Sequence, residues 1–226
     1  ATIPLRWGLT GTIPKADHER VALQASLGEV TNKLSASELQ NIGVLSNCHV
    51  NIVQLKETAV YTNYQSELSY LTTDKKRMEY ISGLIERIAE SGNTLVLVDR
   101  IKAGEMLIEN IDNASFVSGT MKSTDRKDHY DEINEGTNHI LVATYGVAAV
   151  GINIPRIFNL VLLEPGKSFV RVIQSIGRGV RKAQDKDHVE IWDIASTAKY
   201  SKKHLAERKK FYQEANYPFS LEKVDY

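Results

Sequence analysis

The sequence predicts an α/β fold in which an open parallel sheet is flanked by helices. Short, almost continuously apolar runs recur through its middle and later parts, as strands buried on both faces of a parallel sheet require. Amphipathic helical patterns separate these runs, which is typical of βαβ units. The 226 residues are 42% hydrophobic and 25% charged, so the chain has enough apolar surface to form a core and offset chain entropy.

The predicted strands and helices alternate from residue 75 onward. The apolar runs are TLVLV (94–98), ASFVS (114–118), HILVAT (139–144), IFNLVLLE (157–164) and HVEIWDI (188–194). The helical patterns cover residues 75–90, 103–111, 124–134 and 168–182. The first helix places Met78, Ile81, Ile85 and Ile88 at spacings of three and four, which puts them on one face. Residues 75–226 are therefore predicted to form one complete domain.

The preceding part of the chain has a different character. Residues 1–55 are predicted to be the C-terminal edge of a preceding domain, because they are too few to build a core of their own. Within them, residues 17–27 have a helical pattern and NIVQLKE (51–57) reads as a strand. Residues 56–74 are interpreted as a connector. We expect the chain to be part of a larger protein.

The overall charge identifies no partner, because 28 Lys+Arg balance 28 Asp+Glu. Its distribution is more informative, since two stretches are locally basic. Residues 165–182 contain five Lys or Arg and no acid, and residues 199–210 contain six with one acid, Glu207. Such stretches either hold phosphates or form solvated helix faces. For residues 199–210 both interpretations stay open.

The single cysteine, Cys48, excludes an internal disulfide framework and a multi-cysteine zinc site. No apolar run approaches the about 18 residues needed to span a bilayer, and ATIPLRWGLT lacks the pattern of a signal peptide. No metal and no membrane partner are expected. These features predict a cytoplasmic protein, in the host cytoplasm if a phage encodes it.

Aromatic residues interleave with the lysines near the C-terminus. They are Tyr200, Phe211, Tyr212 and Tyr217. Stacking on nucleic-acid bases is one interpretation, but packing against the domain is favoured, because apolar residues at helical spacing usually face a core. Asp193 is expected to act as a cap or turn residue at the end of its strand.

The most informative segment is QSIGRGVRK (174–182), which reads Q-x-x-G-R-x-x-R within a predicted helix. Arg178 and Arg181 are three residues apart and leave the same helix face. Two guanidiniums on one face can clamp a transferring γ-phosphate and neutralise its transition-state charge. The alternative is a basic surface helix that makes ordinary ion pairs.

A second segment, ILVATYGVAAVGINIP (140–155), joins a buried strand to a glycine-containing turn. Thr144 ends the strand, at the edge of the sheet where open α/β folds bind their ligands. Its hydroxyl and the neighbouring N–H groups can hold a phosphate oxygen. An ordinary strand–turn–helix joint is the alternative, and the segment alone does not exclude it.

The segment VLLEPGKS (161–168) imitates a phosphate-binding P-loop but lacks its chemistry. The P-loop needs G-x-x-x-x-G-K-[ST], whereas Val161 occupies the first glycine position. Pro165 also removes one backbone donor. We therefore expect Ser168 to cap the following helix, and a free-standing P-loop phosphotransferase is the least favoured function.

Taken together, five segments resemble helicase motifs III, IV, IVa, V and VI in order. They are LTGTIP (9–14), TLVLVDRIKAGEML (94–107), VSGTMKSTDR (117–126), LVATYGVAAVGINIP (141–155) and QSIGRGVRK (174–182). The chain thus resembles the C-terminal RecA-like half of superfamily 2 helicases. Gly11 and Asn153 depart from the commoner Ala and Asp, and Val180 replaces a frequent Gly, a form similar to the DNA repair and recombination branch.

The resemblance implies a role for each matching position. ATP would bind together with Mg²⁺. The catalytic groups that reach its phosphates would be Gln174, Arg178 and Arg181. Residues that line the nucleotide site would be Gly151, Asn153 and Gly177. Contacts to the nucleic-acid backbone would come from Thr144, Gly119, Arg126 and Lys122. Coupling between domains would come from Thr10 and Thr12. An Asn at position 153 keeps an acceptor oxygen but loses the carboxylate charge.

The implied function is that of the second motor domain of an ATP-dependent DNA helicase or translocase, working with an N-terminal RecA-like domain on branched DNA in repair or recombination. Such a motor holds DNA by contacts to its phosphates, which carry no sequence information. The alternative from another class is a non-catalytic nucleic-acid-binding module that keeps the RecA-like fold without an ATPase. A Walker A loop and an acidic box preceding this sequence would favour the motor.

The 226-residue chain by itself is predicted not to hydrolyse ATP. It contains neither a complete Walker A loop nor an Asp-Glu-x-His/Asp box after an apolar strand, and phosphoryl transfer needs the phosphate loop and the Mg²⁺ ligands that these provide. A phosphate-release assay on the purified chain, with and without DNA, checks this. Sustained turnover would refute it.

Overall fold

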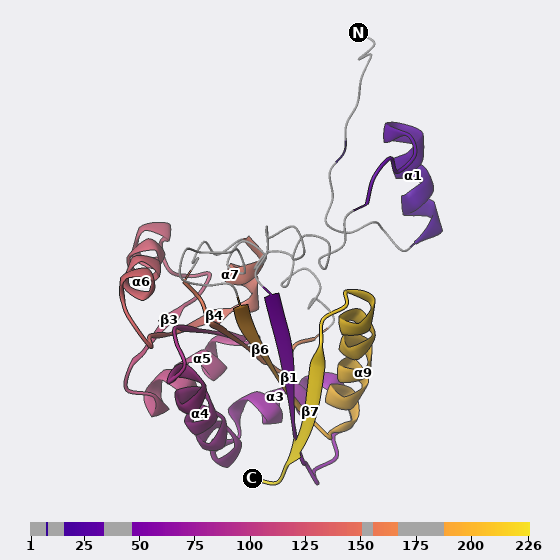
Figure 1. Cartoon of the computed structure of the whole chain (residues 1–226). Helices are drawn as coiled ribbons and strands as arrows, with labels where there is room; N and C mark the ends of the chain where they lie inside the picture. Colours follow the sequence, from indigo (N-terminus) through magenta and orange to yellow (C-terminus); the bar gives the residue numbers. More distant parts are fainter. Residues whose placement is uncertain (1–7, 9–15, 34–46, 151–155, 167–187) are drawn as a thin grey trace. The chain divides into compact units, whose positions relative to one another are not determined.

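The computed structural model describes residues 8, 16–33, 47–150, 156–166 and 188–226 (Figure 1). The chain divides into two compact units, residues 1–35 and residues 36–226. In the described part of the first unit, helix α1 covers Asp17–Leu27, as predicted, and none of its residues is buried. It ends at Gly28, whose φ of 87° suits glycine.

The second unit contains a seven-stranded sheet with every pair of neighbours parallel, in the order β3-β4-β2-β5-β6-β1-β7. Its strands are β1 (Asn47–Leu55), β2 (Thr94–Val98), β3 (Ala114–Val117), β4 (Ile140–Thr144), β5 (Asn159–Leu163), β6 (His188–Ser196) and β7 (Phe219–Val224). The predicted open parallel sheet is confirmed, because each of the five apolar runs lies in one of these strands.

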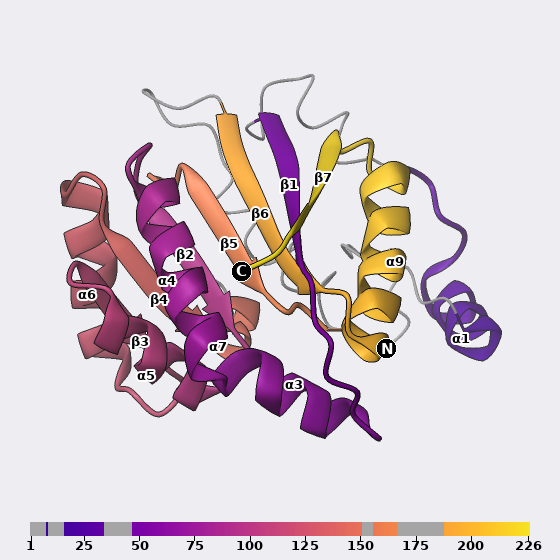
Figure 2. The same cartoon turned by 90° about the horizontal axis from the view of Figure 1, so that it is seen from below.

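Helices flank the sheet on both faces (Figures 1 and 2). In the described residues of this unit they are α3 (Tyr64–Thr73), α4 (Lys75–Ala89), α5 (Ile101–Asn110), α6 (Ser123–Glu135), α7 (Tyr145–Val150) and α9 (Lys199–Glu214). Two of them begin with a side-chain cap: Asn63 accepts a hydrogen bond from the Ser66 amide, and Asp74 from the Arg77 amide.

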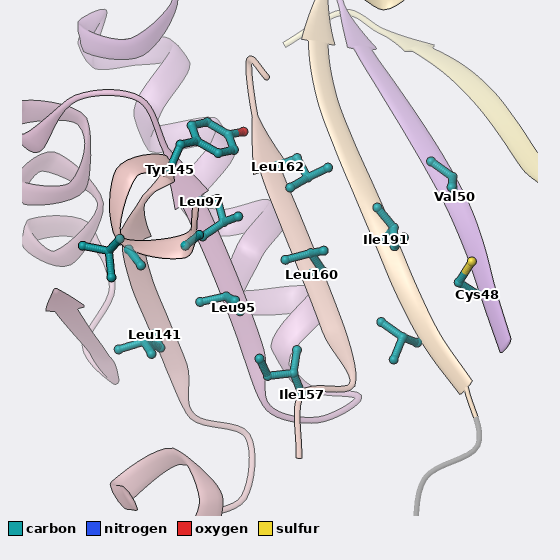
Figure 3. Packing of buried hydrophobic residues seen from close by; sticks show 14 of the residues in the cluster. Cys48, Val50, Leu95, Leu97, Leu141, Tyr145, Ile157, Leu160, Leu162 and Ile191 are labelled. Atoms are coloured by element: carbon teal, nitrogen blue, oxygen red, sulfur yellow. The ribbon is translucent and has the colours of Figure 1, made fainter. Parts of the chain in front are cut away.

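The strands alternate their side chains between two apolar cores. Leu95 and Leu97 of β2 face the core that α7 and α9 cover, together with Tyr145 and Leu162 (Figure 3). Val96 and Val98 face the opposite core, where α4 and α5 pack. Burial on both faces explains why these strands are almost entirely apolar.

Strand β1 corrects the predicted boundary at residue 55. Residues 47–55 lie inside the sheet of the second unit, where β1 pairs with β6 from Asn47↔His188 to Leu55↔Ser196 and with β7 on its other side. The predicted connector, 56–74, likewise contains helix α3. The partners of β1 are more than 130 residues away in sequence, so no local pattern shows which sheet the strand joins.

Helix α9 packs against the sheet through its aromatic residues, as favoured from the sequence. Tyr212 is completely buried, and Phe211 and Tyr217 pack against the same core. The hydroxyl of Tyr200 donates to the Thr62 carbonyl at 3.0 Å. These rings are therefore occupied in the fold.

Asp193 is not a cap or turn residue, since it lies within β6 and is completely buried. Its two carboxylate oxygens accept from Arg208 Nε and Nη2 at 2.7 and 2.8 Å, and the Tyr212 hydroxyl donates to it at 2.7 Å. Burial by itself lowers the pKa of Arg208, but the Asp193 carboxylate outweighs this and raises it. One arginine of the basic stretch 199–210 is therefore structural.

The substitution Arg208→Met should lower the free energy of unfolding by about 3–5 kcal/mol, because it leaves the Asp193 carboxylate buried without a countercharge. Urea denaturation followed by circular dichroism measures this loss. The exposed control Lys210→Met should change little. The double variant Asp193→Asn/Arg208→Met should recover much of the loss, and equal instability of the single and double variants would contradict the assignment.

Candidate nucleic-acid interface

The carboxyl ends of the parallel strands meet at one edge of the sheet, which is where open α/β folds bind ligands. Strands β3 and β4 are neighbours there, with Val117 opposite Ala143. Ser118 therefore leaves β3 directly beside Thr144, the last residue of β4. Thr144 is partly exposed, so its hydroxyl lies at a surface that a ligand can reach.

The loop after β3 forms a compact turn at this edge. The hydroxyls of Ser118 and Thr120 are 2.7 Å apart, and the Met121 amide donates to the Ser118 carbonyl at 3.2 Å. Gly119 is exposed, and a Cβ placed on it would meet no atom within 4 Å. The fold itself therefore does not require glycine at this position.

Two cationic side chains follow at the start of α6. Lys122 precedes the helix with an extended backbone, ψ 151°, and its carbonyl accepts from the Arg126 amide at 3.2 Å. Lys122 is exposed and Arg126 is half-buried. Both cations therefore follow the turn that contains Gly119 closely in sequence, Lys122 just before α6 and Arg126 in its first turn. The structure thus places Thr144 and Gly119 after neighbouring strands, and the roles of these four residues at a nucleic acid stay predictions.

The rest of α6 is acidic. Its carboxylates are Asp125, Asp128, Asp131, Glu132 and Glu135. Arg126 instead lies near Tyr130, where burial raises the pKa of the phenol and the guanidinium opposes this rise. The cations near the start of α6 therefore have carboxylates close to them in sequence, since Asp125 lies in the same first turn as Arg126.

Tyr145, which directly follows Thr144, anchors this end of β4. It is buried, and its hydroxyl donates to the Leu163 carbonyl at 3.1 Å, which ties the end of β4 to the end of β5 (Figure 3). Burial raises the pKa of this phenol well above its ordinary value. The tyrosine therefore stays neutral and keeps the hydrogen bond at any working pH.

A buried ionic network supports the same edge, and the sequence analysis missed it. Arg77 of α4 is 0% exposed; its Nε lies 3.0 Å from Glu57 Oε1 and its Nη2 lies 2.7 Å from Glu164 Oε1. It also donates to the Leu71 carbonyl. The other Glu164 oxygen accepts from the Ser201 hydroxyl at 2.6 Å. The sequence contains one indication of this network, because Arg77 lies on the apolar face of its helix, four residues before Ile81.

The chain that leaves β5 is held by hydrogen bonds at two successive residues, Glu164 and Pro165. Glu164 has a φ of 43°, which is uncommon for a residue with a side chain, and its amide donates to the Ile194 carbonyl at 2.9 Å. The next carbonyl, that of Pro165, accepts from Arg208 Nη1 at 2.6 Å. Two buried arginines thus fix the direction in which the chain leaves β5, towards residues 167–187.

The remaining predicted site residues lie outside the described part of the chain. They are Thr10, Thr12, Gly151, Asn153, Gln174, Gly177, Arg178 and Arg181, together with Lys167 and Ser168 of the P-loop-like segment. Among the described residues, no group of three or more His, Cys, Asp or Glu is placed to hold a metal ion. No helix in that part is long and apolar enough to cross a membrane.

Residues 76–183 match the model of the helicase conserved C-terminal domain. The chain is 27% identical over 217 residues to the ATP-dependent DNA helicase uvsW of Enterobacteria phage T4, covering 91% of this chain and 43% of that protein. It is 26% identical over 211 residues to putative helicase 22 of a Sulfolobus islandicus filamentous virus, covering 84% and 37%. The chain thus spans less than half the length of each of these relatives.

Solved structures show the same fold. The crystal structure of T4 UvsW superposes with a TM-score of 0.67 at 24% identity, covering 79% of this chain and 42% of that one. A fragment of a putative HsdR subunit of a type I restriction enzyme from Vibrio vulnificus superposes with a TM-score of 0.70 at 15% identity, covering 94% and 43%. The predicted RecA-like architecture is therefore confirmed.

The variant Glu164→Gln should change how the free energy of unfolding depends on pH. Burial raises the pKa of this carboxyl above 4.5, although Arg77 and Ser201 oppose the rise. The native state thus binds the proton more tightly than the unfolded state, and the stabilisation present below pH 4.5 is lost as the pH rises through the native pKa. The stability of the parent chain relative to the variant should therefore fall as the pH rises above about 4.5.

Urea denaturation at several pH values measures that difference, and the shared titrations of other groups cancel in it. Glu86→Gln is the matched control, because Glu86 is exposed on α4, and its difference should stay flat. A Glu164 difference that grows with pH would contradict the prediction.

Proposed function

We propose that this chain, whose residues 76–183 match the helicase conserved C-terminal domain, is the second motor domain of an ATP-dependent superfamily 2 DNA helicase or translocase. Its partner would be a first RecA-like domain, which supplies the phosphate loop and the Mg²⁺ ligands. The substrate would be branched DNA during repair or recombination. The form of the G-R-x-x-R segment and the likeness to a phage T4 DNA helicase support this choice.

One observation carries the proposal. Thr144 and Gly119 follow neighbouring strands of the matched domain at one edge of the sheet, and the cations Lys122 and Arg126 follow Gly119 closely in sequence. Hydroxyl, amide and cationic donors are the groups that hold phosphate oxygens. The space beside Gly119 is open, and the fold does not require glycine at this position. A glycine here would let a nucleic-acid backbone approach closely. Binding should therefore tolerate sequence and weaken with salt.

The nucleotide would bind between the two RecA-like domains. Arg178 and Arg181 would neutralise the γ-phosphate of ATP in the transition state, and Gln174 would help to orient it. Gly151, Asn153 and Gly177 would line the nucleotide site. The order of these positions along the matched family domain supports these roles.

Changes of nucleotide state would be transmitted to the DNA. Thr10 and Thr12 would couple the two domains. Closure of the domains around ATP, and their opening after hydrolysis, would then make the Thr144 edge alternately bind and release the DNA backbone. The rigid exit of β5, held by Arg77 and Arg208, favours this coupling, because the chain that leaves it leads into the nucleotide-binding segment.

In a protein that contains both RecA-like domains, Arg181→Ala should lower the DNA-stimulated ATPase rate about 10³-fold or more, because an arginine finger contributes that much to phosphoryl transfer. DNA affinity should stay nearly unchanged. Phosphate release and fluorescence anisotropy measure the two effects. Arg87→Ala, at an exposed arginine of α4, is the matched control and should leave both unchanged.

Unaltered turnover in the Arg181 variant would rule out the finger. A two-domain protein that binds DNA but has no ATPase would instead identify a non-catalytic binding module.

A further inference from the structure

The outer face of α9 carries a row of lysines that the proposed motor site does not use. They are Lys199, Lys202, Lys203, Lys209 and Lys210, here called the α9 lysine row. Resting on the proposed function, we propose that this row is a second DNA contact, which binds the phosphate backbone of the duplex.

Helical geometry places the lysine row on one side. With about 3.6 residues per turn, the five lysines fall within an arc of about 120°. The buried residues of the helix, Ser201, Leu205, Arg208 and Tyr212, occupy a separate arc of about 60°. From Lys199 to Lys210 the row is about 16 Å long, at about 1.5 Å per residue. It therefore forms a straight, one-sided cationic surface.

The charges of the lysine row are largely uncompensated. Lys202 and Lys203 are exposed, and no carboxylate in the described residues lies within 4.0 Å of either ammonium group. Lys210 lies 3.7 Å from Glu207, with both side chains about two-thirds exposed, and such a pair contributes little. A polyanion would therefore find cations that need not first break strong ion pairs.

The helix beneath the row is rigidly anchored. The amides of Tyr200 and Ser201 donate to the buried carboxylate of Glu67 at 2.9 and 2.7 Å. Arg208 is held by Asp193 from the other side. The lysine stems therefore project from a fixed support, which lowers the conformational entropy lost when a partner binds.

The position of the row separates it from the Thr144 edge. Helix α9 begins shortly after the carboxyl end of β6, and β6 is three places from β4 in the sheet. At about 4.8 Å per strand the two surfaces are at least about 14 Å apart. Phosphates along one strand advance about 3.4 Å per nucleotide, so the two surfaces must hold phosphates several nucleotides apart.

Duplex DNA fits this surface better than a single strand does. Proteins that hold single strands stack the bases on outward-facing aromatic rings. On α9 the rings of Phe211 and Tyr212 pack into the core, and the Tyr200 ring makes an edge contact with Tyr64. The half-exposed rings of Tyr200 and Phe219 are covered by Lys199 and Lys209 of the row itself, so the row offers mainly charge, which is suited to a regular backbone whose bases are already paired.

The test compares two triple variants of the 226-residue chain. Lys202→Gln/Lys203→Gln/Lys210→Gln removes three charges from the lysine row, and Lys75→Gln/Lys102→Gln/Lys223→Gln removes three exposed charges from α4, α5 and β7. Gln and Lys have similar helix propensities, so both variants should remain folded. Fluorescence anisotropy with a 30-base-pair duplex of random sequence gives the affinity at a series of salt concentrations.

We expect the plot of log K against log salt to become shallower by about 2 to 3 in the row variant, at about 0.9 for each neutralised phosphate. Its affinity at low salt should fall about tenfold or more, and the control should match the parent.

An unchanged slope in the row variant, or equal losses in both variants, would overturn the proposed DNA contact at the lysine row but not the proposed contact at the Thr144 edge. A parent chain that binds no duplex would overturn both proposals. A preference of the row for single-stranded RNA over the duplex would overturn the duplex assignment.

Discussion

The guanidinium of Arg77 lies completely buried between the carboxylates of Glu57 and Glu164, and the carboxyl edge of the sheet depends on this interaction. It joins α4 to the exits of β1 and β5, and Glu164 extends the connection to Ser201 of α9. Each charge would be expensive to bury alone, but together they satisfy one another. Removing the arginine would leave two buried carboxylates at the edge where ligands bind in such folds.

In this domain the apolar faces of the sheet provide rigidity, and the edge where the strands end provides the polar groups. Both faces of the sheet are covered by helices that pack on branched apolar side chains, so the strands cannot shift against one another. Polar groups gather where the strands end, and there the chain is held by specific hydrogen bonds such as Tyr145 to Leu163. Donors that are fixed in this way lose little freedom when a ligand binds to them.

Much of the fold was predictable, because central strands such as 94–98 and 140–144 carry a local signal: buried on both faces, they are continuously apolar. Strand β7 carries no such signal, since it is mostly exposed at the sheet edge. The sheet membership of β1 and the pairing of Asp193 with Arg208 depend on contacts distant in sequence. Thr144, Gly119, Lys122 and Arg126 were identified as motif positions, and their roles at a nucleic acid, like the roles at the ATP phosphates, stay predictions.

The placement of β1 has a consequence for how the domain is made. This strand is the first of the sheet to leave the ribosome, yet it lies between β6 and β7, which are the last. At about 5–20 residues per second, synthesis leaves it waiting for its neighbours for roughly 10 to 30 seconds. During this time its apolar residues lack their partners, so the sheet can close around β1 only after β6 and β7 have been synthesised.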